Sequence, residues 1–194
     1  MSAKGSKSRK LLFVVIGVWV GVCLIALLVV GLAFSGALPF MPTGLLGSEA
    51  AGAGINIDEL APDFALQNPA GETIRLSDLK GKAVVINFWA TWCGPCVREM
   101  STLQKYQDKY PAFVLLGVDE KESAEEVKAF MQKMKLTYQV LLDENAEVSA
   151  LFQVMIMPTT YFIDEAGVVR ARHFGYMGEE QFEFYLGSLG VIVK

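Results

Sequence analysis

Hydrophobic positions follow two different patterns along the chain. Residues 11–34 form an unbroken apolar run without a charged residue, whereas beyond residue 58 apolar positions recur with the short periods of strands and helices. At about 1.5 Å per residue, a helix over the apolar run is long enough to cross a ~30 Å hydrocarbon layer. The pattern therefore predicts one transmembrane helix, 11–34, in front of one globular domain, 58–194.

Within the predicted domain, strand-like and helix-like segments alternate. The near-continuous apolar runs 83–89 and 113–118 are typical of central strands that are covered on both faces. A helix is predicted to begin after Ser123, which forms a capping box with Glu126. This order, with an extra strand pair in front, predicts an α/β sheet covered by helices on both faces. The remaining expected segments are strands at 73–76, 139–142, 159–163 and 168–173, helices at 93–109, 145–152 and 178–189, and a turn at 77–81.

Charge is distributed unevenly along the chain. Residues 1–10 contain four basic and no acidic residues, so this head carries +4, and the other 13 basic and 21 acidic residues give the rest a net −8. A basic flank stays on the cytoplasmic side of a membrane, which places the acidic domain outside. The acidity of the domain argues against nucleic acid as a partner. A cleavable signal peptide is the alternative, because Ser35-Gly36-Ala37 resembles a cleavage site.

Residues 35–57 connect the two parts. They contain five Gly, two Pro and a single charge, a composition typical of a flexible linker. As a random coil such a segment spans roughly 25–30 Å. The domain is therefore expected to work close to the membrane surface.

Reactive chemistry is concentrated in 92–96, Trp-Cys-Gly-Pro-Cys, where a predicted strand turns into a helix. A helix start favours the thiolate of Cys93, and Cys96 lies one turn away, where it can close a disulfide. Pro95 suits the first helical turn because it has no N–H to lose. A zinc site would need four ligands, and the domain adds only His173 to the two thiols. A purely structural disulfide is the other alternative, although so short a loop stabilises a fold little.

Several motifs surround this pair, and together they are specific. They are Ala-Pro-Asp-Phe at 61–64, Leu-Ser-Asp-Leu-Lys-Gly-Lys at 76–82, Asn-Phe-Trp-Ala-Thr-Trp-Cys-Gly-Pro-Cys at 87–96 with Glu99 following, and Met-Pro-Thr-Thr at 157–160. From about 58 to 190 the chain closely resembles the membrane-anchored thiol-disulfide reductases of the ResA/TlpA type. That resemblance implies a thioredoxin-like fold.

The resemblance also implies roles for the site residues. Cys93 would be the attacking thiol and Cys96 the resolving thiol. Pro158 would be a cis-proline packed against the disulfide, and Met157 would present an exposed edge to an extended substrate segment. Supporting positions would be Trp92, Gly94 and Pro95, which flank or separate the two thiols.

The proton acceptor is where the chain departs from thioredoxin. Thioredoxin has a buried Asp six residues before the first Cys, whereas this chain has Asn87, whose amide cannot take a proton. In the ResA group a Glu in the loop after the next strand acts as the base, and the resemblance places Glu122 there. Glu122 could instead be a solvated acid, and the same loop could aim Asp119 or Glu120 inward.

We therefore predict an extracytoplasmic enzyme that reduces protein disulfides and uses no cofactor or metal beyond the Cys93–Cys96 couple. Because the outer compartment is oxidising, the resemblance also implies a membrane electron donor of the CcdA or DsbD type. Apocytochrome c or copper-site cysteines would be the clients. One alternative is a thiol peroxidase, although the Pro-x-x-x-Thr-x-x-Cys loop of peroxiredoxins is absent before Cys93. Another is a copper-binding assembly module that uses both thiols with Met157 and His173.

Overall fold

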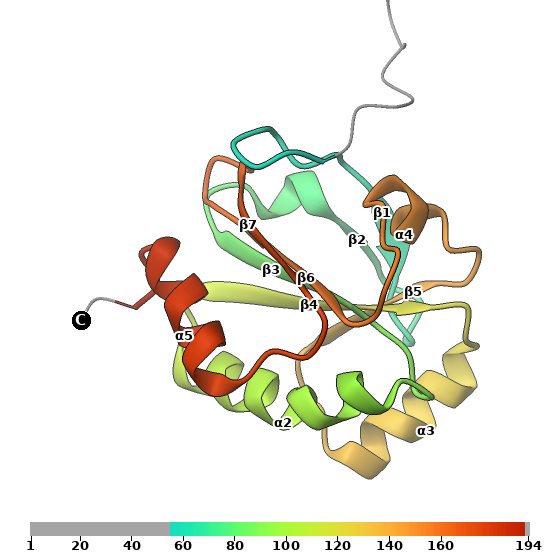
Figure 1. Cartoon of the computed structure of the whole chain (residues 1–194). Coiled ribbons are helices and arrows are strands. Elements are labelled where there is room, and N and C mark those ends of the chain that lie inside the picture. The colour runs from blue at the N-terminus through green and yellow to red at the C-terminus, as the bar shows by residue number, and fades with distance from the viewer. Residues whose placement is uncertain (1–54, 193–194) are drawn as a thin grey trace, which may run out of the picture. The chain divides into compact units, whose positions relative to one another are not determined.

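The computed structural model describes residues 55–192, which form one mixed sheet with helices on both faces (Figure 1). The strands are β1 (Ala65–Gln67), β2 (Thr73–Arg75), β3 (Ala83–Trp89), β4 (Phe113–Glu120), β5 (Gln139–Asp143), β6 (Thr159–Ile163) and β7 (Val169–Phe174). The helices are the 3-10 helix η1 (Leu76–Leu79) and the α-helices α2 (Gly94–Lys109), α3 (Ala124–Met134), α4 (Glu147–Leu151) and α5 (Glu179–Ser188).

Strand β3 lies inside this sheet, between β4 and β6, and the strand order is β2-β1-β5-β4-β3-β6-β7. It pairs in parallel with β4, which in turn pairs in parallel with β5, and the other pairings are antiparallel. All seven residues of β3 are buried, as expected for a strand covered on both faces. The near-continuous apolar run 83–89 therefore predicted this strand correctly.

The two faces of the sheet are covered by different helices. Helices α2, α3 and α5 pack on one face, where Met100, Val127 and Phe182 belong to a single buried cluster. The short helices η1 and α4 cover the other face, where Leu76 and Val148 join a second cluster. Figure 1 shows α2 and α3 on one side of the sheet and α4 on the opposite side. The predicted covering of both faces is confirmed.

One local prediction needs correction. A strand at 73–76 followed by a turn at 77–81 was expected, whereas the strand ends at Arg75 and the next four residues form η1. The cause is a contact from elsewhere in the chain: the Asp63 carboxylate accepts hydrogen bonds from the backbone N–H and the hydroxyl of Ser77. Leu76 is buried at the same point, which holds the turn against the sheet.

The basic head 1–10 and the transmembrane helix 11–34 are predictions that lie outside the described residues. Within residues 55–192, no helix has the length and apolar character needed to span a membrane. The predicted linker 35–57 overlaps the described part at its end. There Ile55 is buried in the core, and the N–H of Asp58 donates to the carbonyl of Val169.

Candidate active site

The two cysteines lie where β3 has ended and α2 begins. Cys93 is the N-cap of α2, and its sulfur accepts a hydrogen bond from the backbone N–H of Cys96 at 3.3 Å. The two residues form a disulfide, with their Cα atoms 5.3 Å apart. Cys93 is 5 % exposed and Cys96 is fully buried. The sulfur of Cys93 therefore lies at the N-terminus of α2, where the helix dipole and the Cys96 N–H favour a thiolate after reduction.

An apolar surface surrounds the disulfide. Trp92 and Met155 are 72 % and 87 % exposed, large values for side chains of this kind. With Ile156 and Met157 they line a cavity of about 470 Å³ that includes Cys93 and the carboxyl-bearing residue Glu120. A segment of a partner protein that reaches Cys93 would therefore contact mainly apolar side chains.

Pro158 connects this surface to the sheet. The peptide bond between Met157 and Pro158 is cis, as the resemblance implied. Pro158 is buried, and its carbonyl accepts a hydrogen bond from the N–H of Gly175 at 2.7 Å. The cis bond is thus confirmed, while the packing of Pro158 against the disulfide and a role for Met157 in substrate docking stay predictions.

Asn87 does not stand alone on β3. Its side-chain amide donates to the Glu99 carboxylate at 2.8 Å and to the Thr160 hydroxyl at 2.9 Å. Glu99 also accepts a hydrogen bond from the backbone N–H of Met177 at 2.9 Å. Burial raises the pKa of Glu99 to about 7, although both hydrogen bonds oppose the rise. Glu99 can therefore exchange a proton near neutral pH.

Sequence reasoning assigned no role to Glu99. It lies three residues after Cys96, on the buried face of α2, and is completely inaccessible to solvent. The available signal was an acidic residue one helical turn beyond the second cysteine of an amphipathic helix. Such a residue has to be buried together with Cys96, and a buried carboxyl is a candidate for proton transfer.

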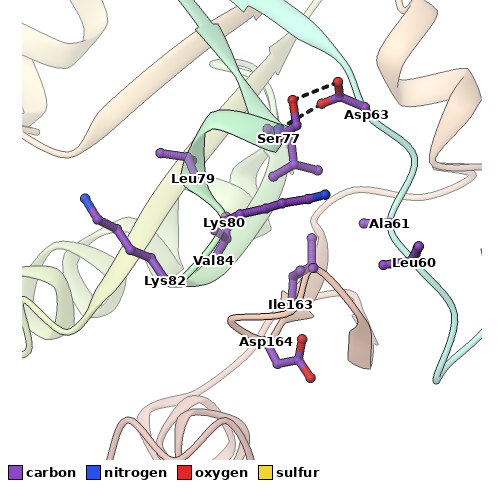
Figure 2. A pocket seen from close by; sticks show the side chains of 12 residues that line it. Leu60, Ala61, Asp63, Ser77, Leu79, Lys80, Lys82, Val84, Ile163 and Asp164 are labelled. Carbon is purple, nitrogen blue, oxygen red and sulfur yellow. Dashed lines mark hydrogen bonds between the residues drawn. The ribbon is translucent and has the colours of Figure 1, made fainter.

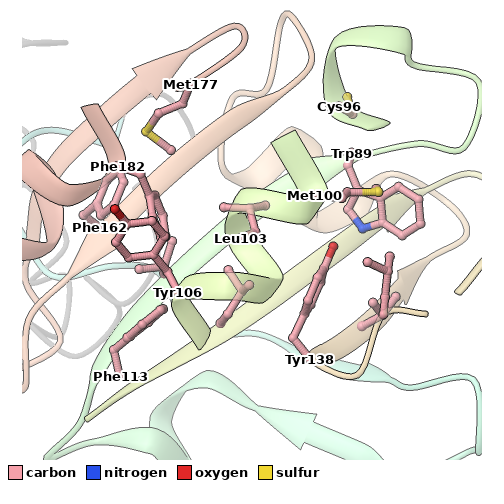
Figure 3. Packing of buried hydrophobic residues seen from close by; sticks show 14 of the residues in the cluster. Trp89, Cys96, Met100, Leu103, Tyr106, Phe113, Tyr138, Phe162, Met177 and Phe182 are labelled. Atoms are coloured by element: carbon pink, nitrogen blue, oxygen red, sulfur yellow. The ribbon is translucent and has the colours of Figure 1, made fainter. Parts of the chain in front are cut away.

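A pair of aromatic side chains packs beside Asn87. Asn87 pairs with Gly117 of β4, and a Cβ atom added at Gly117 would lie 2.9 Å from Cε2 of Tyr138 and 3.0 Å from Nε1 of Trp89. Figure 3 shows Trp89 and Tyr138 with Met100 in this cluster. Gly117 is therefore needed for its size, because any side chain would collide with these rings. Burial, followed by the charge of Glu99, raises the pKa of the Tyr138 hydroxyl.

Two carboxyls lie at the end of β4: Asp119 within the strand and Glu122 just after it. Glu122 accepts hydrogen bonds from the backbone N–H and the hydroxyl of Thr91, in the turn that leads to Cys93. Asp119 is fully buried, and burial together with the neighbouring Glu122 raises its pKa to about 8. The structure thus places Glu122 next to the thiol-bearing turn, as predicted for a base. Its role as proton acceptor stays a prediction.

No arrangement for a metal is found among residues 55–192: no group of three or more His, Cys, Asp or Glu side chains is close enough to hold an ion. His173, which the copper alternative would use, lies on β7. Its ring nitrogens are within hydrogen-bond distance of the Tyr185 hydroxyl and the Tyr176 carbonyl.

Comparison with known proteins gives consistent results. Residues 57–172 match the model of the AhpC/TSA family. The thioredoxin-like protein YneN of Bacillus subtilis is 41 % identical over 134 residues, covering 67 % of this chain and 78 % of YneN. The thiol-disulfide oxidoreductase ResA of Oceanobacillus iheyensis is 38 % identical over 141 residues, covering 69 % and 72 %.

Solved structures show the same fold. A crystal structure from Chlorobium tepidum, assigned as the thiol:disulfide interchange protein DsbE, superposes with a TM-score of 0.65 at 29 % identity, covering 71 % of this chain and 98 % of the other. StoA of Bacillus subtilis superposes with a TM-score of 0.57 at 26 % identity, covering 65 % and 97 %. The mixed sheet and its helices are therefore thioredoxin-like.

Proposed function

The chain belongs to the AhpC/TSA family, as a thiol-disulfide oxidoreductase of the ResA/TlpA type, and on this basis we propose that it reduces disulfides of proteins outside the cytoplasm. The observation that carries the proposal is the disulfide between Cys93 and Cys96, which lies at a helix start beneath the exposed side chains of Trp92 and Met155. A redox couple beneath an exposed apolar surface suits a protein substrate better than a small polar one.

The reaction proceeds in two exchanges. The Cys93 thiolate of the reduced enzyme attacks one sulfur of the client disulfide, and the other client sulfur leaves as a thiolate. Cys96 then loses its proton and attacks Cys93 in the mixed disulfide. This step closes the Cys93–Cys96 bond and releases the second client sulfur. Two electrons pass to the client, which takes up two protons.

A nearby carboxyl receives the proton of Cys96. Glu122, the acceptor expected from the resemblance, is supported by its contact with Thr91. Glu99 is the second candidate, because it lies one turn beyond Cys96 and its pKa is raised to about 7 by burial. Substitution of each carboxyl by its amide separates the two, since only the true acceptor alters the pH dependence of the resolving step.

The proposed enzyme acts at the outer face of a membrane and is returned to the dithiol state by a membrane electron donor of the CcdA or DsbD type. This proposal is supported by the charge-free run 11–34 behind a basic head. Apocytochrome c and copper-site cysteines are the client classes we propose, because their reduced cysteine pairs need protection in an oxidising compartment. Reporter fusions after residue 57 test the orientation, and activity inside the cytoplasm would contradict it.

Trapping of the mixed disulfide tests the function. A Cys96→Ser variant can attack but cannot resolve, so it should accumulate covalent adducts with client proteins that carry cysteine pairs. A Cys93→Ser variant serves as the matched control and should trap none. The protein with both cysteines is then assayed for reduction of protein disulfides and for consumption of peroxide. Turnover of peroxide without reduction of protein disulfides would support the peroxidase alternative instead.

A further inference from the structure

Asp119 is a buried ionisable group that the proposed mechanism leaves unused. It lies near the end of β4, where it pairs with Trp89 on one side and with Leu142 of β5 on the other. The residue is fully buried, and neither carboxyl oxygen accepts a hydrogen bond from a donor group among residues 55–192. A carboxylate in this position would be costly, because burial of an unpaired charge carries a large penalty.

The chain turns back on itself directly after this strand. Lys121 adopts the left-handed conformation with φ 65°, and its N–H donates to the Asp143 carbonyl at 3.2 Å. The reversal brings the carboxyl and the backbone N–H of Glu122 next to the Asp119 carboxyl. The two Glu122 oxygens in turn receive the Thr91 hydroxyl and the Thr91 N–H. A line of contacts therefore runs from Asp119 through Glu122 to the turn before Cys93.

The charged residues that raise the pKa of Asp119 are acidic. Glu122 acts on it from the same loop and Glu126 from the first turn of α3. The neighbours that pair with it on β3 and β5 are Trp89 and Leu142, which carry no charge. These surroundings and its burial raise the pKa of Asp119 to about 8, so the residue holds a proton at neutral pH.

We propose that Asp119 is a positioning residue that shares its proton with the Glu122 carboxylate. This bridge holds Glu122 in its hydrogen bonds with Thr91 and so fixes the turn that carries Cys93. The inference rests on the proposed attack by Cys93 and adds a group that influences the ionisation of the Cys93 thiol. When Asp119 loses its proton, two adjacent carboxylates repel each other and the bridge is lost. The added negative charge also opposes formation of the Cys93 thiolate. Ionisation of Asp119 and of Cys93 are therefore coupled.

Alkylation of Cys93 as a function of pH tests this coupling. The experiment uses the reduced full chain with Cys96→Ser, so that a single active-site thiol reacts, and it reads the adduct at Cys93 by mass spectrometry. With Asp119 present, the rate of Cys93 alkylation should rise over a broad pH range, because Asp119 and Cys93 titrate as a coupled pair. Asp119→Asn keeps a hydrogen-bond donor for Glu122 and removes the ionisation, so the profile should narrow to a single step. Its midpoint should move to lower pH by up to about one unit, equivalent to about a tenfold higher rate on the rising limb.

Two further variants separate this role from a merely structural one. Glu122→Gln breaks the same carboxyl pair but leaves Asp119 able to ionise, so the profile should stay broad. The double variant should show the single step of Asp119→Asn. Glu125→Gln changes an exposed carboxyl in the first turn of α3 and should leave the profile unchanged. A single-step profile with Asp119 present, or a broad profile that persists in Asp119→Asn, would overturn the proposal. Reduction of insulin by the enzyme with both cysteines would continue in either case, so the proposed function is judged separately.

Discussion

Acidic side chains near the two ends of strand β3 have pKa values that are shifted in opposite directions. Beyond its first residues lies an apolar pocket of about 240 Å³ with Asp63 and Asp164 among its lining residues (Figure 2). Both are paired: Asp63 with Ser77 and Arg75, and Asp164 with Arg170. Burial alone would raise their pKa values, but these hydrogen bonds and charges outweigh it, and the pKa of each carboxyl is lowered.

At the other end, near the disulfide, neither Glu99 nor Asp119 forms an ion pair with a residue of the described part of the chain. Burial raises the pKa of Glu99 to about 7 and that of Asp119 to about 8. The carboxyls with raised pKa values thus lie at the end that carries the disulfide. A paired and exposed carboxylate remains charged and holds a turn in place, whereas a buried carboxyl with a pKa near neutral can give up or accept a proton during a reaction.

The largest contrast between the two ends should come from the attacking thiol. Cys93→Ser should reduce insulin-disulfide reductase activity to the uncatalysed background, because no other described residue supplies a thiolate at the helix start. Lys82→Ala, at the distal pocket, should retain full activity. Turbidity of the reduced insulin measures both. Comparable losses in the two variants would show that the distal end takes part in the reaction.

The next largest difference is expected in how Glu99 and Asp63 make the free energy of unfolding depend on pH. The folded-state pKa of Glu99, about 7, lies above its ordinary value of 4.5, so its stabilising effect is complete below pH 4.5 and is lost as the pH rises to 7. The loss is on the order of 3 kcal/mol at most, since one pKa unit is equivalent to about 1.4 kcal/mol.

Glu99→Gln should remove this loss, and urea unfolding between pH 4.5 and 8 measures it. The distal carboxyl Asp63 has a lowered pKa, so its contribution is lost in the opposite direction, as the pH falls. Asp63→Asn should therefore alter stability at neutral pH and leave the slope between pH 5 and 8 as it is. An unchanged slope in Glu99→Gln would refute the assignment of a raised pKa to Glu99.

Close packing at Gly117, near the disulfide end of β3, should make the fold sensitive to a small added side chain. Gly117→Ala should destabilise the fold by about 1–3 kcal/mol, because the added methyl group meets Tyr138 and Trp89 at 3.0 Å or less. Gly187→Ala on α5 is the matched control, since outside the helix the added methyl group would meet only the Ile192 carbonyl oxygen, at 3.9 Å, and alanine favours a helix. Chemical denaturation measures both variants, and equal stabilities would contradict the close packing at Gly117.

The smallest effect is expected at the distal ion pair between Arg75 and Asp63. Both side chains are about half exposed and 3.4 Å apart, so Arg75→Gln should change the free energy of unfolding by less than about 1 kcal/mol. Reductase activity should stay at the level of the unsubstituted protein. A marked loss of activity would mean that charge at this end reaches the disulfide.

The elements that position the cysteines could be predicted from the sequence because their signals are local. The apolar run 83–89 gave β3, and the position of Cys93 before an amphipathic segment gave the start of α2. The cis bond at Pro158 came through the resemblance, since a lone proline does not reveal its isomer.

The carboxyls were harder to predict because their surroundings come from distant segments. Glu99 is bound by Asn87 on β3 and by Met177, which lies 78 positions further along the chain. Nothing in the residues next to Glu99 shows these partners. For Asp119, the acidic composition of the segment is compatible with a solvated face, whereas the structure buries the residue completely.

A single turnover followed by mass spectrometry tests the central claim most directly. Reduced enzyme is mixed with an equal amount of a peptide that carries one disulfide, and both products are mapped. We predict one Cys93–Cys96 disulfide formed for each peptide reduced, and a mixed disulfide through Cys93 when the enzyme carries Cys96→Ser. A peptide adduct on Cys96 of the Cys93→Ser variant that forms equally fast, or peptide reduction without the Cys93–Cys96 bond, would contradict the account.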